Sequence, residues 1–284
     1  MTCIIPAAGR VMSHVSSEPD LRTTDDAIRK YLGLAAAVAL FGVFAAGPAW
    51  AQVSEGCPAP APQAIDFSQP LNLDLIKNRL VYYRCTQYDA DVAKSLAEAQ
   101  EWVGIRAPQV SKPAIVLDID ETSLSNWTRI YKNHFAFFWR GPCDLADKLE
   151  ACGNQVWEES AQAPPLKPTL DLFNFAKCQD QPPHPNCTSV AVFFITGWIQ
   201  ISKIKEATEK NLDQAGYLDW DGLYLRDPST LGRPVAEIKT AARIDIESRL
   251  GYTIIANIGD QESDLAGGHA ERRFKVPNPF YLIP

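Results

Sequence analysis

The sequence predicts an α/β fold in which a parallel sheet is covered by helices on both faces. Four apolar runs of strand length alternate with segments of helical periodicity, a pattern typical of βαβ units. Each run is almost continuously apolar, as expected for strands buried on both faces. The runs are 114–117, 189–195, 223–225 and 252–258, and a shorter fifth run lies at 274–276.

The composition is that of an ordinary globular protein. The chain has 284 residues, of which 46% are hydrophobic and 21% charged, enough for one α/β domain with a sizeable core or two small domains. Its net charge of -7 argues against a nucleic-acid polymer as partner, because non-specific binding to nucleic acid needs a basic face. A small phosphorylated substrate remains compatible, since a local cation can outweigh a diffuse negative field.

Residues 1–51 are predicted to be a leader with a signal peptide. Arg29-Lys30 precedes an apolar core over 31–46, and Ala49-Trp50-Ala51 places small residues where a signal peptidase reads. We expect cleavage before Gln52, a periplasmic or secreted mature protein, and no stable membrane association afterwards. An uncleaved membrane anchor is the alternative. Acidic residues ahead of the core do not suit a positively charged n-region, so we expect translation to start downstream of Met1.

Six cysteines remain after the leader, and their spacing predicts disulfides. Cys143 and Cys152 have the same separation as Cys178 and Cys187, so we expect these two bridges, which leaves Cys57 to pair with Cys85. The absence of a C-x-x-C pair argues against a structural zinc site. Reduced, buried cysteines and lipidation of Cys57 are the alternatives.

The first half of the mature chain is predicted to contain a linker, two helices, one strand and an irregular insert. Residues 52–70 are rich in Pro and Ala and predict an extended linker. The apolar spacing over 71–102 predicts two amphipathic helices, broken near 85–87, ahead of the strand at 114–117. An irregular, aromatic-rich insert follows at about 123–167. Its rings are predicted either to roof a pocket or to pack a small sub-core.

The second half alternates regularly between helices and strands. Two of its helices end at a glycine, Gly216 and Gly251, the residue that most easily adopts the left-handed conformation after a helix. The expected helices are 168–178, 199–215 and 237–250.

Polar residues follow the apolar runs where the strands end. Because ligands of a parallel sheet bind beyond the carboxyl ends of its strands, Asp118, Asp120, Thr196, Asp260 and Asp264 are expected to converge on one site. Buried carboxylates need a compensating charge. The four aspartates form an oxygen-rich metal site that suits Mg²⁺ better than zinc.

The same site has the groups needed to bind and transfer a phosphoryl group. Lys239 opens the helix at 237–250 and supplies a fixed positive charge, with Lys203 and Lys205 as weaker candidates for that role. Thr196 supplies a hydroxyl, and Gly197 lets backbone amides approach an anion closely. With the metal, these groups describe a phosphoryl-transfer centre.

A mechanism follows from this inventory. Asp118, kept ionised by the metal and Lys239, attacks phosphorus and forms an aspartyl-phosphate. Asp120 protonates the leaving oxygen and then activates water. Glu121 is expected to cap or solvate the following turn rather than to act as a third catalyst.

Four motifs resemble those of the haloacid dehalogenase (HAD) superfamily. They are Asp118-x-Asp120-x-Thr122, Thr196-Gly197, Lys239 and Gly259-Asp260-Gln261-x-Ser263-Asp264. The form Asp118-Ile119-Asp120-Glu121-Thr122 and the ending Phe274-Lys275-Val276-Pro277-Asn278-Pro279 resemble the acid phosphatase branch, subfamily IIIB. That branch includes bacterial class B and class C acid phosphatases and plant vegetative storage proteins. The resemblance implies a Rossmann-like sheet in one domain over 71–284, with the insert as a small cap.

The resemblance also implies a role for each motif residue. Asp118 would be nucleophile and metal ligand, and Asp120 would be the acid/base that contacts the metal through its backbone carbonyl. Asp260 would ligate Mg²⁺. Thr196 and Lys239 would bind the phosphoryl group. Asp264 would support the metal shell and Lys239. Many relatives have an arginine after Thr-Gly, whereas this chain has Trp198, which bears on substrate preference.

The sequence therefore predicts an exported, Mg²⁺-dependent acid phosphatase that acts on small phosphomonoesters. A non-catalytic storage or binding protein on the same fold is the alternative, and the presence of Asp118 favours the enzyme. Phosphotransfer to an alcohol remains open. A nucleotide-sugar glycosyltransferase ranks last, because its D-x-D motif needs no Lys239. The sequence sets neither the natural phosphoester nor whether the chain forms a homo-oligomer.

Overall fold

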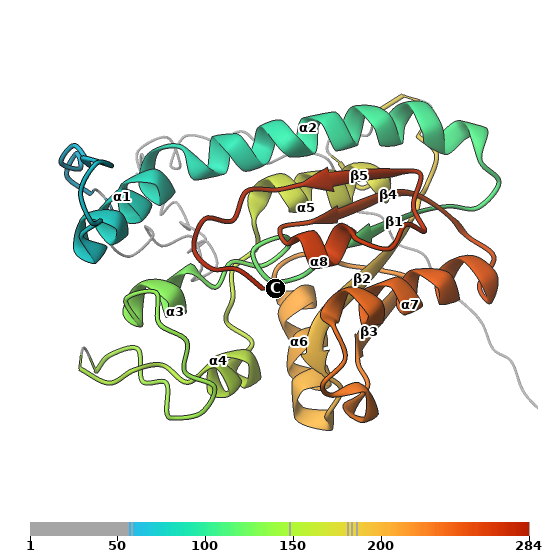
Figure 1. Ribbon diagram of the computed structural model, residues 1–284. Helices are drawn as coiled ribbons and strands as arrows, with labels where there is room; N and C mark the ends of the chain where they lie inside the picture. The colour runs from blue at the N-terminus through green and yellow to red at the C-terminus, as the bar shows by residue number, and fades with distance from the viewer. Residues whose placement is uncertain are drawn as a thin grey trace, which may run out of the picture. The chain divides into compact units, whose positions relative to one another are not determined.

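The computed structural model describes residues 57, 59–147, 149–180, 182, 184–185 and 187–283 (Figure 1). The predicted signal peptide, its cleavage site before Gln52 and the first part of the predicted linker lie outside these residues. No helix in the described ranges is both long and apolar enough to cross a membrane.

The described chain is built around a five-stranded parallel sheet, as predicted. The strand order is β3-β2-β1-β4-β5, so β1 occupies the centre and the topology reverses between β1 and β4. Every residue of β1 is buried. The strands are β1 (Pro113–Leu117), β2 (Ala191–Ile199), β3 (Gly222–Arg226), β4 (Thr253–Gly259) and β5 (Arg272–Lys275).

Helices cover both faces of the sheet because alternate residues of β1 point to opposite sides. Ile115 and Leu117 pack into one core with α2 and α5, whereas Ala114 and Val116 pack into a second core with α7 (Figure 1). The helices are α1 (Leu73–Thr86), α2 (Tyr88–Arg106), α3 (Trp127–Lys132), α4 (Asn154–Ser160), α5 (Lys167–Ala176), α6 (Ser202–Gln214), α7 (Val235–Ser248) and α8 (Glu262–Leu265), with 3₁₀ turns at Ala107–Gln109 and Pro228–Thr230.

The two predicted N-terminal helices are confirmed as α1 and α2, separated at Gln87. The side chain of Asn72 caps α1 by accepting hydrogen bonds from two backbone amides of the first turn. The indole of Trp102 on α2 donates to the carbonyl of Ile255 in β4 at 2.7 Å, which fixes the long helix against the sheet.

Element boundaries differ from the prediction at two places that affect the site. The prediction ended the second strand at Ile195, but β2 continues through Thr196 and Gly197 to Ile199, which pairs with Arg226 after an irregularity in register. The helix expected to begin near residue 237 begins at Val235, so Lys239 lies one turn inside α7 rather than at its opening. The glycines predicted to follow α6 and α7 do adopt positive φ.

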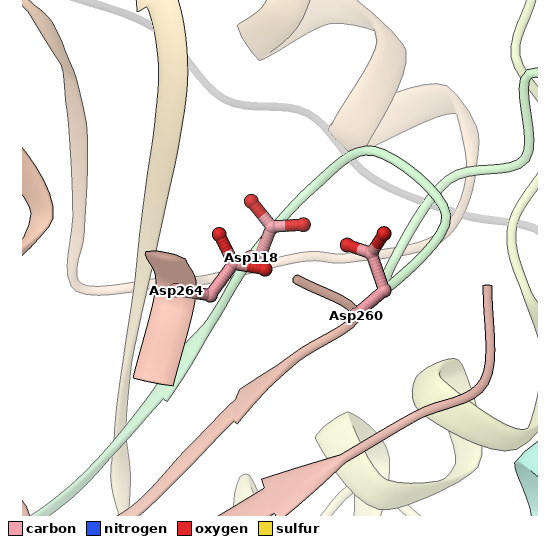
Figure 2. Close-up of side chains that lie close together, drawn as sticks. All are labelled: Asp118, Asp260 and Asp264. Carbon is pink, nitrogen blue, oxygen red and sulfur yellow. The ribbon is translucent and has the colours of Figure 1, made fainter. Parts of the chain in front are cut away.

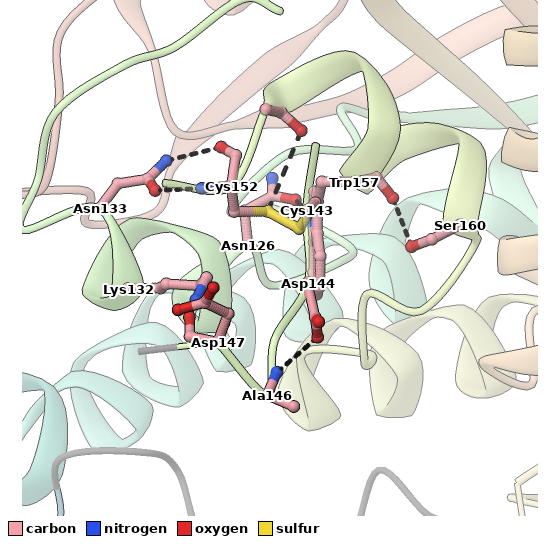
Figure 3. Close-up of a disulfide and its surroundings, with 11 residues drawn as sticks. Asn126, Lys132, Asn133, Cys143, Asp144, Ala146, Asp147, Cys152, Trp157 and Ser160 are labelled. Atoms are coloured by element: carbon pink, nitrogen blue, oxygen red, sulfur yellow. Dashed lines mark hydrogen bonds between the residues drawn. A yellow bond between two sulfur atoms is a disulfide. The ribbon is translucent and has the colours of Figure 1, made fainter. Parts of the chain in front are cut away.

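All three predicted disulfides are present: Cys57–Cys85, Cys143–Cys152 and Cys178–Cys187. Figure 3 shows how the second of these closes the loop between α3 and α4. There the side chain of Asn133 bonds both backbone groups of Cys152, at 2.8 and 2.9 Å. The insert is thus a small cross-linked unit. It is joined to the chain that follows the central strand β1, because Leu124 forms isolated β-bridges with both Asp120 and Pro165.

Candidate active site

The predicted site residues gather at the carboxyl ends of the strands, around a pocket of about 550 Å³. All of them line this pocket except Thr196, which is buried behind it and accepts a hydrogen bond from the backbone amide of Trp198 at 3.2 Å. Lys203 and Lys205 lie on α6 and are not among the lining residues. The lining residues with predicted roles are Asp118, Asp120, Gly197, Lys239, Asp260 and Asp264.

Three of the four predicted metal ligands form a compact carboxylate cluster. Asp118 follows β1, Asp260 follows β4 and Asp264 lies on α8 (Figure 2). One carboxylate oxygen from each lies within 4.8 Å of the others, and all three side chains are buried. Asp120, the fourth predicted ligand, is not part of this cluster.

The short segment after β4 positions Asp264. One oxygen of the Asp264 carboxylate accepts the backbone N–H of Gln261 at 2.8 Å, which forms a capping box at the start of α8. Gly259 permits this turn, because a Cβ at that position would lie 2.4 Å from Cβ of Asp264. The other carboxylate oxygen is left to face Lys239.

Lys239 is the buried cation of the cluster. Its ammonium group pairs with Asp118 and, at 2.6 Å, with Asp264. Burial alone lowers the pKa of Lys239, but the two carboxylates outweigh it, and the net direction is upward. Burial and then the charge of Asp264 raise the pKa of Asp118 well above its ordinary value, against the opposing effect of Lys239.

The donor set fits a hard divalent cation. One ammonium pairs with two of the three buried carboxylates, so the ionised cluster carries an excess of negative charge that low-dielectric surroundings penalise. Convergent carboxylate oxygens with excess charge are the ligands that Mg²⁺ and similar cations prefer. The arrangement therefore supports a divalent metal at Asp118, Asp260 and Asp264.

Asp120 is held apart from the cluster by two neutral donors. Asn126 donates to one carboxylate oxygen at 2.8 Å, and the indole of Trp198 donates to the other at 2.6 Å. Burial raises the pKa of Asp120, and these two hydrogen bonds work in the opposite direction. Trp198 thus orients a predicted catalytic residue.

The C-terminal segment closes one side of the site, which the sequence did not indicate beyond its Pro-Asn-Pro motif. The amide of Asn278 donates to Asp260 at 2.7 Å, and the hydroxyl of Tyr281 donates to Glu121 at 2.5 Å. Glu121 caps the following turn as predicted, by accepting the N–H of Asn126 at 2.5 Å, but it is buried rather than solvated. Burial, followed by the charge of Asp120, raises the pKa of Glu121 to about 7.

The aromatic residues of the insert line the pocket, as one of the two predictions had it, but they do not form a separate sub-core. Phe135, Phe137 and Trp139 line the pocket, and Trp139 stacks on Trp198 with ring centroids 5.9 Å apart. Trp157, in contrast, is buried in the core and donates to the side chain of Asn126 at 2.6 Å. The insert therefore forms part of the pocket wall, and its buried side chains join the main core that also contains Ile115 and Leu117 of β1.

The fold is similar to that of a solved bacterial acid phosphatase. The chain resembles the class C acid phosphatase from Bacillus anthracis with a TM-score of 0.52 and 20% identity, over 72% of this chain and 86% of that one. This similarity shows the fold. A second structure of that enzyme has tungstate bound.

The sequence comparison identifies the family. A profile of the HAD superfamily, subfamily IIIB (acid phosphatase), matches residues 68–284, so the chain belongs to this family.

The curated relatives are plant proteins. The Stem 28 kDa glycoprotein of Glycine max is 36% identical over 61% of each chain. Acid phosphatase 1 of Solanum lycopersicum is 32% identical over 59% of this chain and 58% of its own length. Vegetative storage protein 2 of Arabidopsis thaliana is 39% identical over 78% of this chain and 76% of its own length. The chain thus spans less than two thirds of the soybean and tomato relatives.

Proposed function

We propose that this chain is a Mg²⁺-dependent acid phosphatase that hydrolyses small phosphomonoesters through an aspartyl-phosphate. The observation that carries the proposal is the buried cluster of Asp118, Asp260 and Asp264 with Lys239, in a pocket where Asp120 is held separately. A nucleophile next to a fixed cation and a separate acid/base is what phosphoryl transfer to a carboxylate requires.

In the first step, a carboxylate oxygen of Asp118 attacks phosphorus while the bond to the leaving oxygen breaks. Asp120 gives its proton to that oxygen, so the alcohol leaves neutral. The raised pKa that burial gives Asp120 favours the protonated form that this step needs. In the second step, Asp120 takes a proton from water, and the resulting hydroxide attacks phosphorus and releases phosphate and free Asp118.

The remaining groups bind the phosphoryl oxygens. Lys239 contributes a fixed charge, and Thr196 with the backbone at Gly197 is proposed to donate hydrogen bonds after a modest rearrangement of the Thr196 hydroxyl. Mg²⁺ would be held by Asp118, Asp260 and Asp264, with the backbone carbonyl of Asp120 as a further ligand, and would neutralise charge on the phosphoryl group. The tungstate bound by the Bacillus anthracis enzyme, a tetrahedral oxyanion, is consistent with such a pocket.

Export is part of the proposal. Three disulfides indicate an oxidising compartment, and the predicted signal peptide accounts for delivery there. We propose a periplasmic or secreted protein, with residues 71–284 as the catalytic domain and about 123–167 as its cap.

The test is hydrolysis of p-nitrophenyl phosphate by the purified protein with Mg²⁺, with EDTA, and as Asp118→Asn. Activity is expected to require the metal and to vanish in Asp118→Asn, whereas Asp171→Asn, an exposed aspartate on α5, retains it. Activity in folded Asp118→Asn would refute the assigned nucleophile. A folded wild type that is inactive on several phosphomonoesters from acid to neutral pH would support the storage alternative.

Adding glycerol to the same assay separates hydrolysis from transfer. Equal release of p-nitrophenol and phosphate shows that water is the acceptor. An excess of p-nitrophenol over phosphate shows transfer to the alcohol.

A further inference from the structure

We propose that Arg129 and Asn154 of the insert bind a second anionic group on the substrate, attached to the alcohol that leaves. The substrates would then be phosphomonoesters whose alcohol carries a carboxylate or a further phosphate. This inference rests on the proposed function and specifies its substrate class.

Arg129 is a buried cation that forms no hydrogen bond or ion pair with the residues that the structure describes. It lies in α3, lines the pocket and is 6% exposed. Its Nε has no hydrogen-bond partner, and among the described residues its guanidinium makes no hydrogen bond or ion pair. Its guanidinium lies 5.9 Å from the ring centroid of Phe137. Its charge also lowers the pKa of two buried carboxyls, those of Asp120 and Glu158, but in the described part of the chain neither carboxyl forms a hydrogen bond or ion pair with it. A buried guanidinium is costly unless it is paired, so the pocket is expected to supply an anion.

The other arginine of the pocket shows the contrast. Arg226 also lines it, and its Nε likewise has no hydrogen-bond partner, but its Nη2 donates to the carbonyls of Thr230 and Arg233, each at 2.8 Å. Arg226 is therefore committed to the structure, whereas Arg129 is available to a ligand.

Asn154 provides the second unpartnered group. It is fully buried, lines the same pocket, and both its Oδ1 and its Nδ2 lack a hydrogen-bond partner. Its backbone is fixed, because its N–H donates to the carbonyl of Phe138 at 2.7 Å and the preceding Gly153 donates to Pro142 at 2.8 Å. No side chain fits at Gly153, where a Cβ would lie 2.2 Å from the carbonyl oxygen of Gly141. Asn154 is thus part of a built site.

The position of Arg129 places it on the leaving-group side. In phosphoryl transfer the attacking and leaving oxygens lie roughly in line on opposite sides of phosphorus. Asp118 is on the attacking side and Asp120 protonates the leaving oxygen. Asn126, which holds Asp120, is the N-cap of α3 and lies three residues before Arg129. Arg129 is close enough to Asp120 for its charge to lower the pKa of that carboxyl, so the two side chains lie on the same side of the pocket. Arg129 therefore faces what is attached to the leaving oxygen.

The donor groups of Arg129 and Asn154 suit an anionic ligand. A guanidinium presents parallel donors that match a carboxylate or phosphate, and the amide of Asn154 can add a donor. The phosphoryl group already has Lys239 as its own cation. A neutral alcohol would leave Arg129 desolvated and unpaired, so binding is expected to discriminate against it.

The test compares 4-carboxyphenyl phosphate with 4-carbamoylphenyl phosphate, a neutral substrate of nearly the same shape. Hydroquinone bisphosphate tests phosphate as the second anion. Wild type is expected to prefer an anionic substrate about 10- to 100-fold in kcat/KM, the range of a hydrogen bond to a charged group. Arg129→Met is expected to abolish this preference and Arg129→Lys to retain part of it. Arg140→Met, which removes an exposed arginine of the same insert, is expected to leave it intact.

Two outcomes would overturn the inference. One is a wild type with no preference for either anion. The other is an Arg129→Met variant, folded by circular dichroism, that loses the same factor on anionic and neutral substrates, because Arg129 would then act on the phosphoryl group or on Asp120.

A binding measurement separates this inference from the proposed function. Calorimetry with 4-carboxybenzyl and 4-carbamoylbenzyl phosphonate needs no turnover, and the carboxylate is expected to bind 10- to 100-fold more tightly in an Arg129-dependent way. If no phosphate ester is hydrolysed but this ratio is found, the proposed function is wrong and the anion site stands. If esters are hydrolysed and the ratio is one, only the anion site is refuted.

Discussion

Replacing Lys239 with methionine is expected to destabilise the metal-free protein strongly. Lys239, Asp118 and Asp264 have side chains that are 5–7% exposed, so the variant leaves buried carboxylates without their cation. Breaking a buried ion pair by removing one partner costs about 3–5 kcal/mol. For a domain of this size the melting temperature falls by roughly 2–4 °C per kcal/mol, which gives a decrease of about 6–20 °C.

The assay is thermal unfolding followed by circular dichroism, in EDTA and in Mg²⁺. The matched control is Lys167→Met, which breaks a pair of similar length, 2.6 Å to Asp171, whose side chains are 80% and 53% exposed. Such surface pairs are worth about 0–1 kcal/mol. The decrease for Lys239→Met should be larger in EDTA than in Mg²⁺, because the metal compensates part of the charge. A decrease in EDTA no larger than that of the control would refute this reasoning.

Three further predictions concern the surroundings of the site. Asn278→Leu removes the hydrogen bond to Asp260 and should weaken Mg²⁺ binding about 10- to 100-fold by calorimetry; unchanged affinity would show that Asn278 does not orient this ligand. Because burial raises the pKa of Glu121 to about 7, the folded, metal-free protein holds a proton there that the unfolded chain releases at lower pH. The stabilisation from that proton is complete below pH 4.5 and is lost as the pH rises to 7, so wild type should lose stability relative to Glu121→Gln between pH 5 and 7.5 in urea unfolding with EDTA. If the difference in unfolding free energy between wild type and Glu121→Gln is the same at pH 5 and pH 7.5, this prediction is wrong. Replacing Cys143 and Cys152 together with serine opens a short loop and should cost about 2–3 kcal/mol in urea, and a smaller loss would mean that the reduced loop keeps its structure.

The fold and the carboxylate cluster were predictable because both depend on local patterns. Buried strands are continuously apolar, and the residue that ends such a run lies at the ligand-binding edge of a parallel sheet. Asp118 and Asp260 both satisfy this rule, and each lies directly after its strand. The cysteine spacing likewise predicted the disulfides, since a short separation restricts the partners that each cysteine can reach.

The walls of the pocket were not predictable in the same way. The sequence treated Thr196-Gly197 as a strand end, whereas β2 continues past it and so presents Trp198 to Asp120. Asn278 reaches Asp260 from the far end of the chain through tertiary packing alone. Arg129 has no periodic or spacing signal in the sequence. Its guanidinium lacks a hydrogen-bond partner because of how the side chains of the folded insert are oriented, and the sequence does not show that orientation.

The central place of β1 also affects how the chain folds. Both neighbours of β1 come later in the sequence, and the hydrogen bond between Thr122 and Asp260 joins residues 138 positions apart. Pairings of such long range form slowly, and until then an apolar strand with free edges can pair with other chains. Lys112 and Asp118 flank the strand with charges, an arrangement that opposes aggregation. Asp118, the proposed nucleophile, would thus also oppose aggregation of the unfolded chain before the active site has formed.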